Sequence, residues 1–148
     1  MSKVLAAAAA LWAMSLGMAT PGFLAAAPPA AAKAEYTLLP KPGTRVPLGT
    51  THYFIFGFTR PPKLGNAIMR VDLFTLDGRP DRSFAIQGEA DMPSMRGAHS
   101  HGPKPFALSA KGAYLLPVQL VMPGDWEIRF TFERPGAPVF RCAYPFDL

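Results

Sequence analysis

The sequence predicts an all-β fold, an antiparallel β-sandwich of about seven or eight short strands. Three observations support this prediction. Residues 126–133 read WEIRFTFE, an unbroken alternation of apolar and polar side chains that is typical of a strand with one buried face. Turn signals recur along the chain at intervals of about ten residues. The chain also contains 17 prolines, a residue that interrupts helices and is tolerated in loops.

Five segments show the strand pattern most clearly, namely residues 52–58, 67–76, 83–91, 113–122 and 126–133. In the first of them Phe54, Phe56 and Phe58 share one face, which we expect to be buried. The DGRP sequence at residues 77–80 indicates a turn. Weaker strand signals lie at residues 36–39, 106–109 and 139–144. Together these segments give the strand count of a small sandwich.

A short PGD sequence at residues 123–125 separates two of the segments. Because this turn is so short, we expect residues 113–122 and 126–133 to pair as an antiparallel hairpin. Pro117 lies within the first of the two segments. A proline cannot donate a hydrogen bond to a neighbouring strand, so we expect Pro117 to mark an edge strand or a bulge.

The first 34 residues have the layout of a secretory signal peptide. Lys3 precedes an uncharged apolar stretch at residues 4–19, and small residues that suit cleavage follow up to Ala27 and up to Ala34. We expect cleavage after Ala34, which leaves one domain, residues 35–148, in the periplasm or outside the cell. The alternative is an uncleaved anchor, but residues 4–19 fall short of the roughly 20 apolar residues of a spanning helix. No later segment is apolar enough to span a bilayer.

The charge pattern does not favour a nucleic-acid partner. The whole chain has a formal net charge of +5, and 13 basic and 10 acidic residues remain without Lys3 and Lys33. The basic residues are scattered and form no cluster with interleaved aromatic side chains, which a nucleic-acid surface would need. Cys142 is the only cysteine, so the domain has no internal disulfide. Its alternation with Phe140 and Tyr144 predicts a buried side chain rather than a reactive thiol.

Residues 91–101, DMPSMRGAHSH, carry the side chains that suggest a function. Pro93 and Gly97 interrupt regular structure there, so we expect a loop between two strands, where binding groups tend to lie. Two methionines carry thioethers, soft ligands that favour Cu(I), and two histidines carry imidazoles, which bind copper or zinc. The sequence therefore predicts a metal site, for copper above other ions. The candidate ligands are Met92, Met95, His99 and His101.

A second interpretation of this loop is structural. Methionines often fill gaps in an apolar core, so Met92 and Met95 would close one end of the sandwich, and the two histidines would be solvated. His52 begins another strand, and we expect its own neighbours to satisfy it there. The soft ligands are irregularly spaced, so the residues alone leave both interpretations open.

No catalytic residue is predicted. Ser94, His99 and Asp91 are the residue types of a catalytic triad, but they lie on one loop, whereas a triad needs partners that separate elements hold in place. Glu89 and Asp91 share one face of a strand, which we expect to be exposed. The sequence contains no glycine-rich phosphate loop and no zinc-hydrolase spacing. We therefore expect a protein that is not an enzyme.

The order of several motifs resembles the YtkA-like domains, a family related to the periplasmic part of FixH proteins. A strand ends in LDGRP, then comes EADMPSM with a nearby histidine, and then KGAYLLPVQLVMPGDWEIRFTF. The matching positions are Met92, Pro93, Met95, His99, Gly112, Tyr114, Met122, Gly124 and Trp126. The resemblance spans residues 67–132. The chain departs from the family pattern where Gly78 directly follows Asp77 and where three residues separate Met95 from His99.

The resemblance implies an exported immunoglobulin-like β-sandwich that is associated with copper handling or with cytochrome oxidase assembly, and it implies no catalytic activity. Together with the loop, it favours a carrier, buffer or assembly factor that binds a copper ion and passes it to an exported or membrane protein. The alternative function is a structural or protein-interaction module of the cell envelope that binds no metal.

Overall fold

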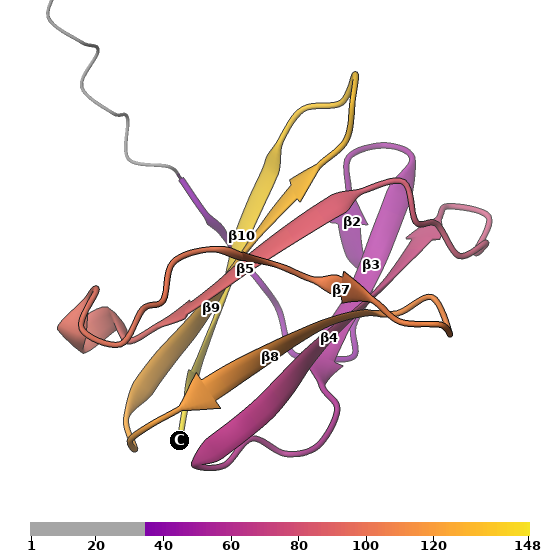
Figure 1. The fold of residues 1–148 in the computed structure, drawn as a ribbon. Helices are drawn as coiled ribbons and strands as arrows, with labels where there is room; N and C mark the ends of the chain where they lie inside the picture. Colours follow the sequence, from indigo (N-terminus) through magenta and orange to yellow (C-terminus); the bar gives the residue numbers. More distant parts are fainter. Residues whose placement is uncertain (1–34) are drawn as a thin grey trace, which may run out of the picture. The chain divides into compact units, whose positions relative to one another are not determined.

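A computed structural model of the protein describes residues 35–148 (Figure 1). The predicted signal peptide and both predicted cleavage positions lie outside the described residues, so the export signal stays a prediction. Within residues 35–148, none of the helices has the length and the hydropathy that a membrane crossing requires.

The described residues form a β-sandwich of two five-stranded sheets. The first sheet has the order β1-β10-β9-β5-β6, and the second has the order β2-β3-β4-β8-β7. In chain order the strands are β1 (Thr37–Leu38), β2 (Val46–Leu48), β3 (His52–Phe58), β4 (Gly65–Thr75), β5 (Ala85–Asp91), β6 (Lys104–Pro105), β7 (Ala107–Leu108), β8 (Tyr114–Leu120), β9 (Asp125–Glu133) and β10 (Phe140–Asp147). A short 3₁₀ helix, η1 (Pro93–Met95), follows β5.

The core lies between the two sheets, because the long strands turn every second side chain inward. In β9 the buried residues are Trp126, Ile128, Phe130 and Phe132, as the alternating sequence predicts. Aromatic rings from opposite sheets pack against each other there. The ring centroids of Phe54 in β3 and Phe132 in β9 lie 4.6 Å apart.

The strand predictions agree closely with the structure. The five clearest segments are β3, β4, β5, β8 and β9, and each end lies within two residues of its predicted position. Two of the three weaker segments contain β1 and β7. The third, residues 139–144, covers only the first five residues of β10, which continues to Asp147. The prediction missed β2 and β6, which have three and two residues. The turn after β4 is also present, because Gly78 has a φ of 84° and its N–H donates to the Thr75 carbonyl at 2.9 Å.

The predicted hairpin across residues 123–125 is wrong. β8 pairs with β4 and β7, whereas β9 pairs with β10 and β5, so the chain crosses from one sheet to the other at this turn. Gly124 exchanges two backbone hydrogen bonds with Leu148, of 3.2 and 3.0 Å. The Trp126 indole donates to the Met122 carbonyl at 3.0 Å. These contacts satisfy polar groups of the turn without a hairpin ladder.

The sequence predicted purely antiparallel sheets, but the first sheet also contains one parallel pair. β1 pairs with β10 in parallel, with Thr37 opposite Cys142 and Leu38 opposite Ala143. Cys142 itself is fully buried, which confirms the prediction from its alternation. Burial raises the pKa of the Cys142 thiol well above its usual value, so the thiolate that reacts with oxidants and metals is scarce.

On one side of the sandwich, the edges of the two sheets approach each other at β5 and β8. Gly88 of β5 permits this approach, since a Cβ at this position would lie 2.5 Å from Leu116 Cδ2 and 2.6 Å from Phe106 Cε2. β8 pairs with β7 at its first two residues only. Pro117 therefore lies on an edge that has no partner strand within residues 35–148, as predicted. The loop after β5 runs from η1 back along this strand toward β7 (Figure 1).

Candidate functional site

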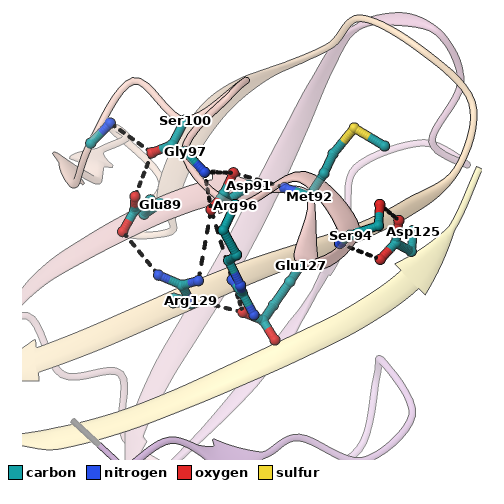
Figure 2. A network of polar contacts seen from close by, with 11 residues as sticks. Glu89, Asp91, Met92, Ser94, Arg96, Gly97, Ser100, Asp125, Glu127 and Arg129 are labelled. Atoms are coloured by element: carbon teal, nitrogen blue, oxygen red, sulfur yellow. Dashed lines mark hydrogen bonds and ion pairs between the residues drawn. The ribbon is translucent and has the colours of Figure 1, made fainter. Parts of the chain in front are cut away.

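A buried carboxylate fixes the start of the loop that carries the predicted ligands (Figure 2). Asp91 ends β5, and its side chain accepts a hydrogen bond from the Met92 N–H at 2.9 Å. The Gly97 N–H lies 3.2 Å from both oxygens of the same carboxylate. Guanidinium nitrogens of Arg96 and Arg129 approach it to 3.8 Å. The chain thus wraps around Asp91 between Met92 and Gly97, where a φ of 81° favours glycine.

Two further contacts attach η1 and the residue after it to β9. Ser94 donates to the Asp125 carboxylate from its N–H at 2.9 Å and from its hydroxyl at 2.5 Å. The hydrogen bond from the Ser94 hydroxyl lowers the pKa of the Asp125 carboxyl below its usual value. Arg96 donates to the Glu127 carboxylate at 2.8 Å. Figure 2 shows these contacts reaching from the loop to β9.

The second half of the loop is attached to β5. The Ser100 hydroxyl donates to the Glu89 carboxylate, and the Gly102 N–H donates to Ser100 Oγ at 3.0 Å. Arg129 joins both halves, because its guanidinium lies 3.6 Å from Glu89 and donates to Glu127 at 2.8 Å. Side chains of β5 and β9 therefore hold the loop from one end to the other.

Two of the four predicted ligands line the same cavity. His99 and His101 both line a cavity of about 310 Å³, whereas Ser100 between them is not part of its wall. Neither Met92 nor Met95 lines this cavity. Met95 ends η1 and is 37% exposed. The predicted cluster of four convergent ligands is thus not present as such.

Met92 belongs to the core. Its side chain is 2% exposed and is a member of the buried apolar cluster. The Met92 Cε lies 3.0 Å from the position that a Cβ on Gly124 would occupy, so this methionine fills the space beside the crossing between the sheets. We therefore correct the prediction of Met92 as an open metal ligand to one of core packing.

The cavity lies between the loop and the edges of the two sheets. Its polar lining consists of His99, His101, Asn66, Lys104 and Gln119. Leu116, Pro117 and Val118 of β8 form an apolar wall, and Gly88 and Ala90 of β5 lie opposite. Lys104 provides a positive charge, and none of the described residues in the lining is a carboxylate. The half-buried ring of His99 packs near Trp126, with 6.4 Å between the ring centroids.

His52 lies away from this cavity. The loop is attached to the first residues of β9, whereas His52 lies near Arg134, the residue that follows the last one of β9. His52 is buried, its Nε2 lies 2.9 Å from Asp81 Oδ2, and its Nδ1 lies 2.7 Å from Thr51 Oγ1. Its own neighbours therefore satisfy this histidine, as predicted.

Within the described part of the chain, no group of three or more histidine, cysteine, aspartate and glutamate side chains is arranged to hold a metal ion. A metal ion at His99 and His101 would therefore need a further ligand of another chemical type. The exposed thioether of Met95 is such a ligand on the same loop.

Sequence reasoning missed the carboxylates that hold the loop. It placed Glu89 and Asp91 on an exposed face, but the loop covers Asp91, which is 3% exposed. The register of β5 and β9 sets Arg129 opposite Glu89 and Glu127 opposite Asp91. Three carboxylates and the Arg129 guanidinium thus gather under the loop. The sequence indicates this charge cluster only when β5 and β9 are known to be neighbouring strands.

Comparison with known proteins identifies the fold. The chain matches no family model and no curated protein. Among solved structures, the chain is similar to FetP of uropathogenic Escherichia coli strain F11, in its form as isolated after recombinant expression in the periplasm of E. coli BL21(DE3). The TM-score is 0.53 and the identity is 11%, over 72% of this chain and 93% of that chain.

Two further structures are similar to the same extent. A copper-bound glutamate-to-glutamine variant of the same FetP has a TM-score of 0.53 and 11% identity, over 71% of this chain and 93% of that chain. A DUF4426 family protein from Pseudomonas aeruginosa PAO1 has a TM-score of 0.51 and 11% identity, over 71% of this chain and 96% of that chain. The chain shares its β-sandwich fold with these proteins. The resemblance to YtkA-like domains stays a prediction.

Proposed function

We propose that the protein is a periplasmic β-sandwich that binds Cu(I) through His99 and His101. The observation that carries this proposal is that His99 and His101 both line one cavity. The protein would carry or buffer the ion and pass it to a partner protein by exchange of ligands. Imidazole and thioether ligands suit copper in this chemistry.

The hydrogen bonds of the loop support the proposal, because they prepare the two histidines for a shared ligand. Ser100 is bound to Glu89 and, through its Oγ, to the Gly102 N–H. The side chains on either side of Ser100 then lie along the same cavity. A loop that such contacts already hold loses little conformational freedom when an ion binds to it.

Met95 is our candidate for a third ligand. It lies on the same loop as the histidines and is partly exposed, and its unbranched side chain has three rotatable bonds with which to reach an ion. Its thioether sulfur is a soft ligand that selects Cu(I) over harder ions. Met92 is not part of the proposed site, because it is packed in the core.

The charge of the cavity favours a monovalent ion. Of the residues that the structure describes, Lys104 is the only charged one that lines it. Because repulsion between Lys104 and a bound ion rises with the charge of the ion, we expect Cu(I) to bind in preference to Cu²⁺ or Zn²⁺. The copper-bound FetP variant has a similar fold, which supports copper at the level of the fold alone.

An anaerobic Cu(I) titration in competition with a chromogenic chelator tests the proposal on purified protein expressed from the complete chain. We expect one ion per chain with a Kd below about 1 μM. The double variant His99→Asn, His101→Asn should bind at least about tenfold more weakly. As a control, Gln119→Ala removes another side chain of the cavity that is not a soft ligand, and it should bind as the natural protein does. Binding weaker than micromolar, or unchanged binding by the double variant, would overturn the proposal.

A further inference from the structure

A second cavity, of about 410 Å³, lies at the end of the sandwich away from the loop. Its walls come from the turn between β2 and β3, from Phe84 and from the loop between β9 and β10. The apolar side chains of its lining are Leu48, Phe84, Ala137, Pro138, Val139 and Phe140. A cavity of this size and composition suits a small organic ligand.

Among residues 35–148, Arg134 is the only charged side chain that lines this second cavity. Its guanidinium carbon lies 4.7 Å from the centroid of the Phe84 ring, so the ring holds the cation in the wall. Within residues 35–148, no carboxylate forms an ion pair with Arg134. The cavity therefore combines an apolar wall with an unpaired, half-buried positive charge.

His52 does not provide the missing acceptor. Its Nε2 lies 3.5 Å from Arg134 Nη1 but only 2.9 Å from Asp81 Oδ2. One ring nitrogen can donate to a carboxylate or accept from a guanidinium, but it cannot do both. A carboxylate only accepts hydrogen bonds, so the closer Asp81 takes the Nε2 proton, and Nδ1 lies 2.7 Å from Thr51 Oγ1. Among the described residues, no other side chain accepts a hydrogen bond from Arg134.

We propose that this second cavity binds a small aliphatic carboxylate. The carboxylate would pair with Arg134 through two parallel N–H···O hydrogen bonds, a geometry for which guanidinium is suited. The hydrocarbon chain would lie against the apolar wall, where its removal from water favours binding. The second cavity and the proposed copper cavity share no lining residue, so this inference is independent of copper.

Calorimetric titration of the purified protein, expressed from the complete chain, with octanoate and with octanol tests this inference. We expect octanoate to saturate a single site and to bind at least about tenfold more tightly than octanol, because the alcohol has no charge to pair with Arg134. In amide NMR spectra, octanoate should shift the signals of residues 49–51, Gly136, Ala137 and Val139, which line the cavity. Equal binding of the acid and the alcohol, or shifts confined to other residues, would overturn the inference.

Two variants of Arg134 separate its charge from its geometry. Arg134→Gln should weaken octanoate binding at least about tenfold, and Arg134→Lys should retain part of the affinity, because it keeps the charge but not the fork of donors. Arg60→Gln is the control, since Arg60 is exposed and lies outside the cavity. If Arg134→Gln bound octanoate with the same affinity as the natural protein, the inference would be overturned. If urea unfolding shows that this variant is not folded, the comparison of octanoate with octanol decides.

Discussion

The Ser100 hydroxyl donates a hydrogen bond to the Glu89 carboxylate, and this contact directs Ser100 to strand β5 while its two neighbours line the cavity. The loop therefore owes its arrangement to charged side chains of β5 and β9. Asp91, Glu89, Glu127 and Arg129 form the support on which the loop rests. Substitution of these side chains should therefore change the stability of the loop and of the fold.

Asp91→Asn should destabilise the fold by about 1–3 kcal/mol, because the buried Met92 N–H and the partly buried Gly97 N–H lose a charged acceptor. The Gly97 N–H and two guanidinium groups depend on this carboxylate. Urea unfolding measures the free-energy change. Asp72→Asn is the control, because Asp72 pairs with Arg70 at 2.7 Å on the surface, and such pairs contribute at most about 1 kcal/mol. Equal losses in the two variants would contradict the role of Asp91.

The two methionines of the loop should differ in their effect on stability. Met92→Ala should lower the free energy of unfolding by about 2–5 kcal/mol, as expected for a cavity in the core. Met95→Ala should change it by no more than about 0.5 kcal/mol, because Met95 is on the surface. Thermal or urea unfolding distinguishes them, and similar values for both variants would show that Met92 is not a core residue.

In copper binding, substitution of Met95 should have an effect and substitution of Met92 should have none. Met95→Leu should weaken Cu(I) binding at least about threefold, since the variant keeps the volume but loses the soft sulfur. Met92→Leu should leave the Cu(I) affinity unchanged. Competition titrations of both variants measure the difference. If only Met92→Leu lost Cu(I) affinity, Met92 and not Met95 would be the methionine ligand.

Gly88→Ala should destabilise the sandwich by about 1–3 kcal/mol through overpacking. A Cβ at this position would lie 2.5 Å from Leu116 Cδ2 and 2.6 Å from Phe106 Cε2, and both side chains are buried. Gly57→Ala is the matched control in another strand, because its Cβ would have an ordinary contact of 3.6 Å with Pro42. Unfolding curves that coincide for the two variants would contradict the close approach of β5 and β8.

The contact between Ser94 and Asp125 makes stability depend on acid pH. The Ser94 hydroxyl lowers the pKa of the Asp125 carboxyl in the folded protein below the ordinary value of 3.8. The contact therefore stabilises the fold fully above pH 3.8, and this contribution is lost as the pH falls through the lowered value. Carboxyl NMR titration should show that Ser94→Ala raises the pKa of Asp125 while that of Asp77 stays the same. Identical Asp125 titrations in both proteins would contradict this contact.

Most of the fold could be predicted from the sequence, because a strand with one buried face leaves a direct alternation of residue types. Trp126 to Phe132 in β9 illustrates this. The crossing at Gly124 could not be predicted, since a short turn has the same composition whether it joins two strands of one sheet or two sheets. Its partner, Leu148, lies at the far end of the described chain.

Only part of the candidate site could be predicted from the sequence. The residue types of the loop indicated a metal site. A loop, however, lacks the regular alternation of a strand, so its sequence does not show which side chains point inward. The burial of Met92 and the exposure of Met95 depend on η1 and on the hydrogen bonds of Asp91. These contacts join residues of β5 and β9 to the loop, so they follow from the tertiary fold.

Long-range ¹H–¹⁵N NMR of the imidazole rings tests the proposed copper site most directly. The protein has three histidines, and His52 is an internal control because Asp81 and Thr51 occupy its two ring nitrogens. When one equivalent of Cu(I) is added without oxygen, we expect the ring nitrogen signals of His99 and His101 to shift together while those of His52 stay in place. Unchanged signals of His99 and His101, or a shift of His52 alone, would contradict a copper site at these two residues.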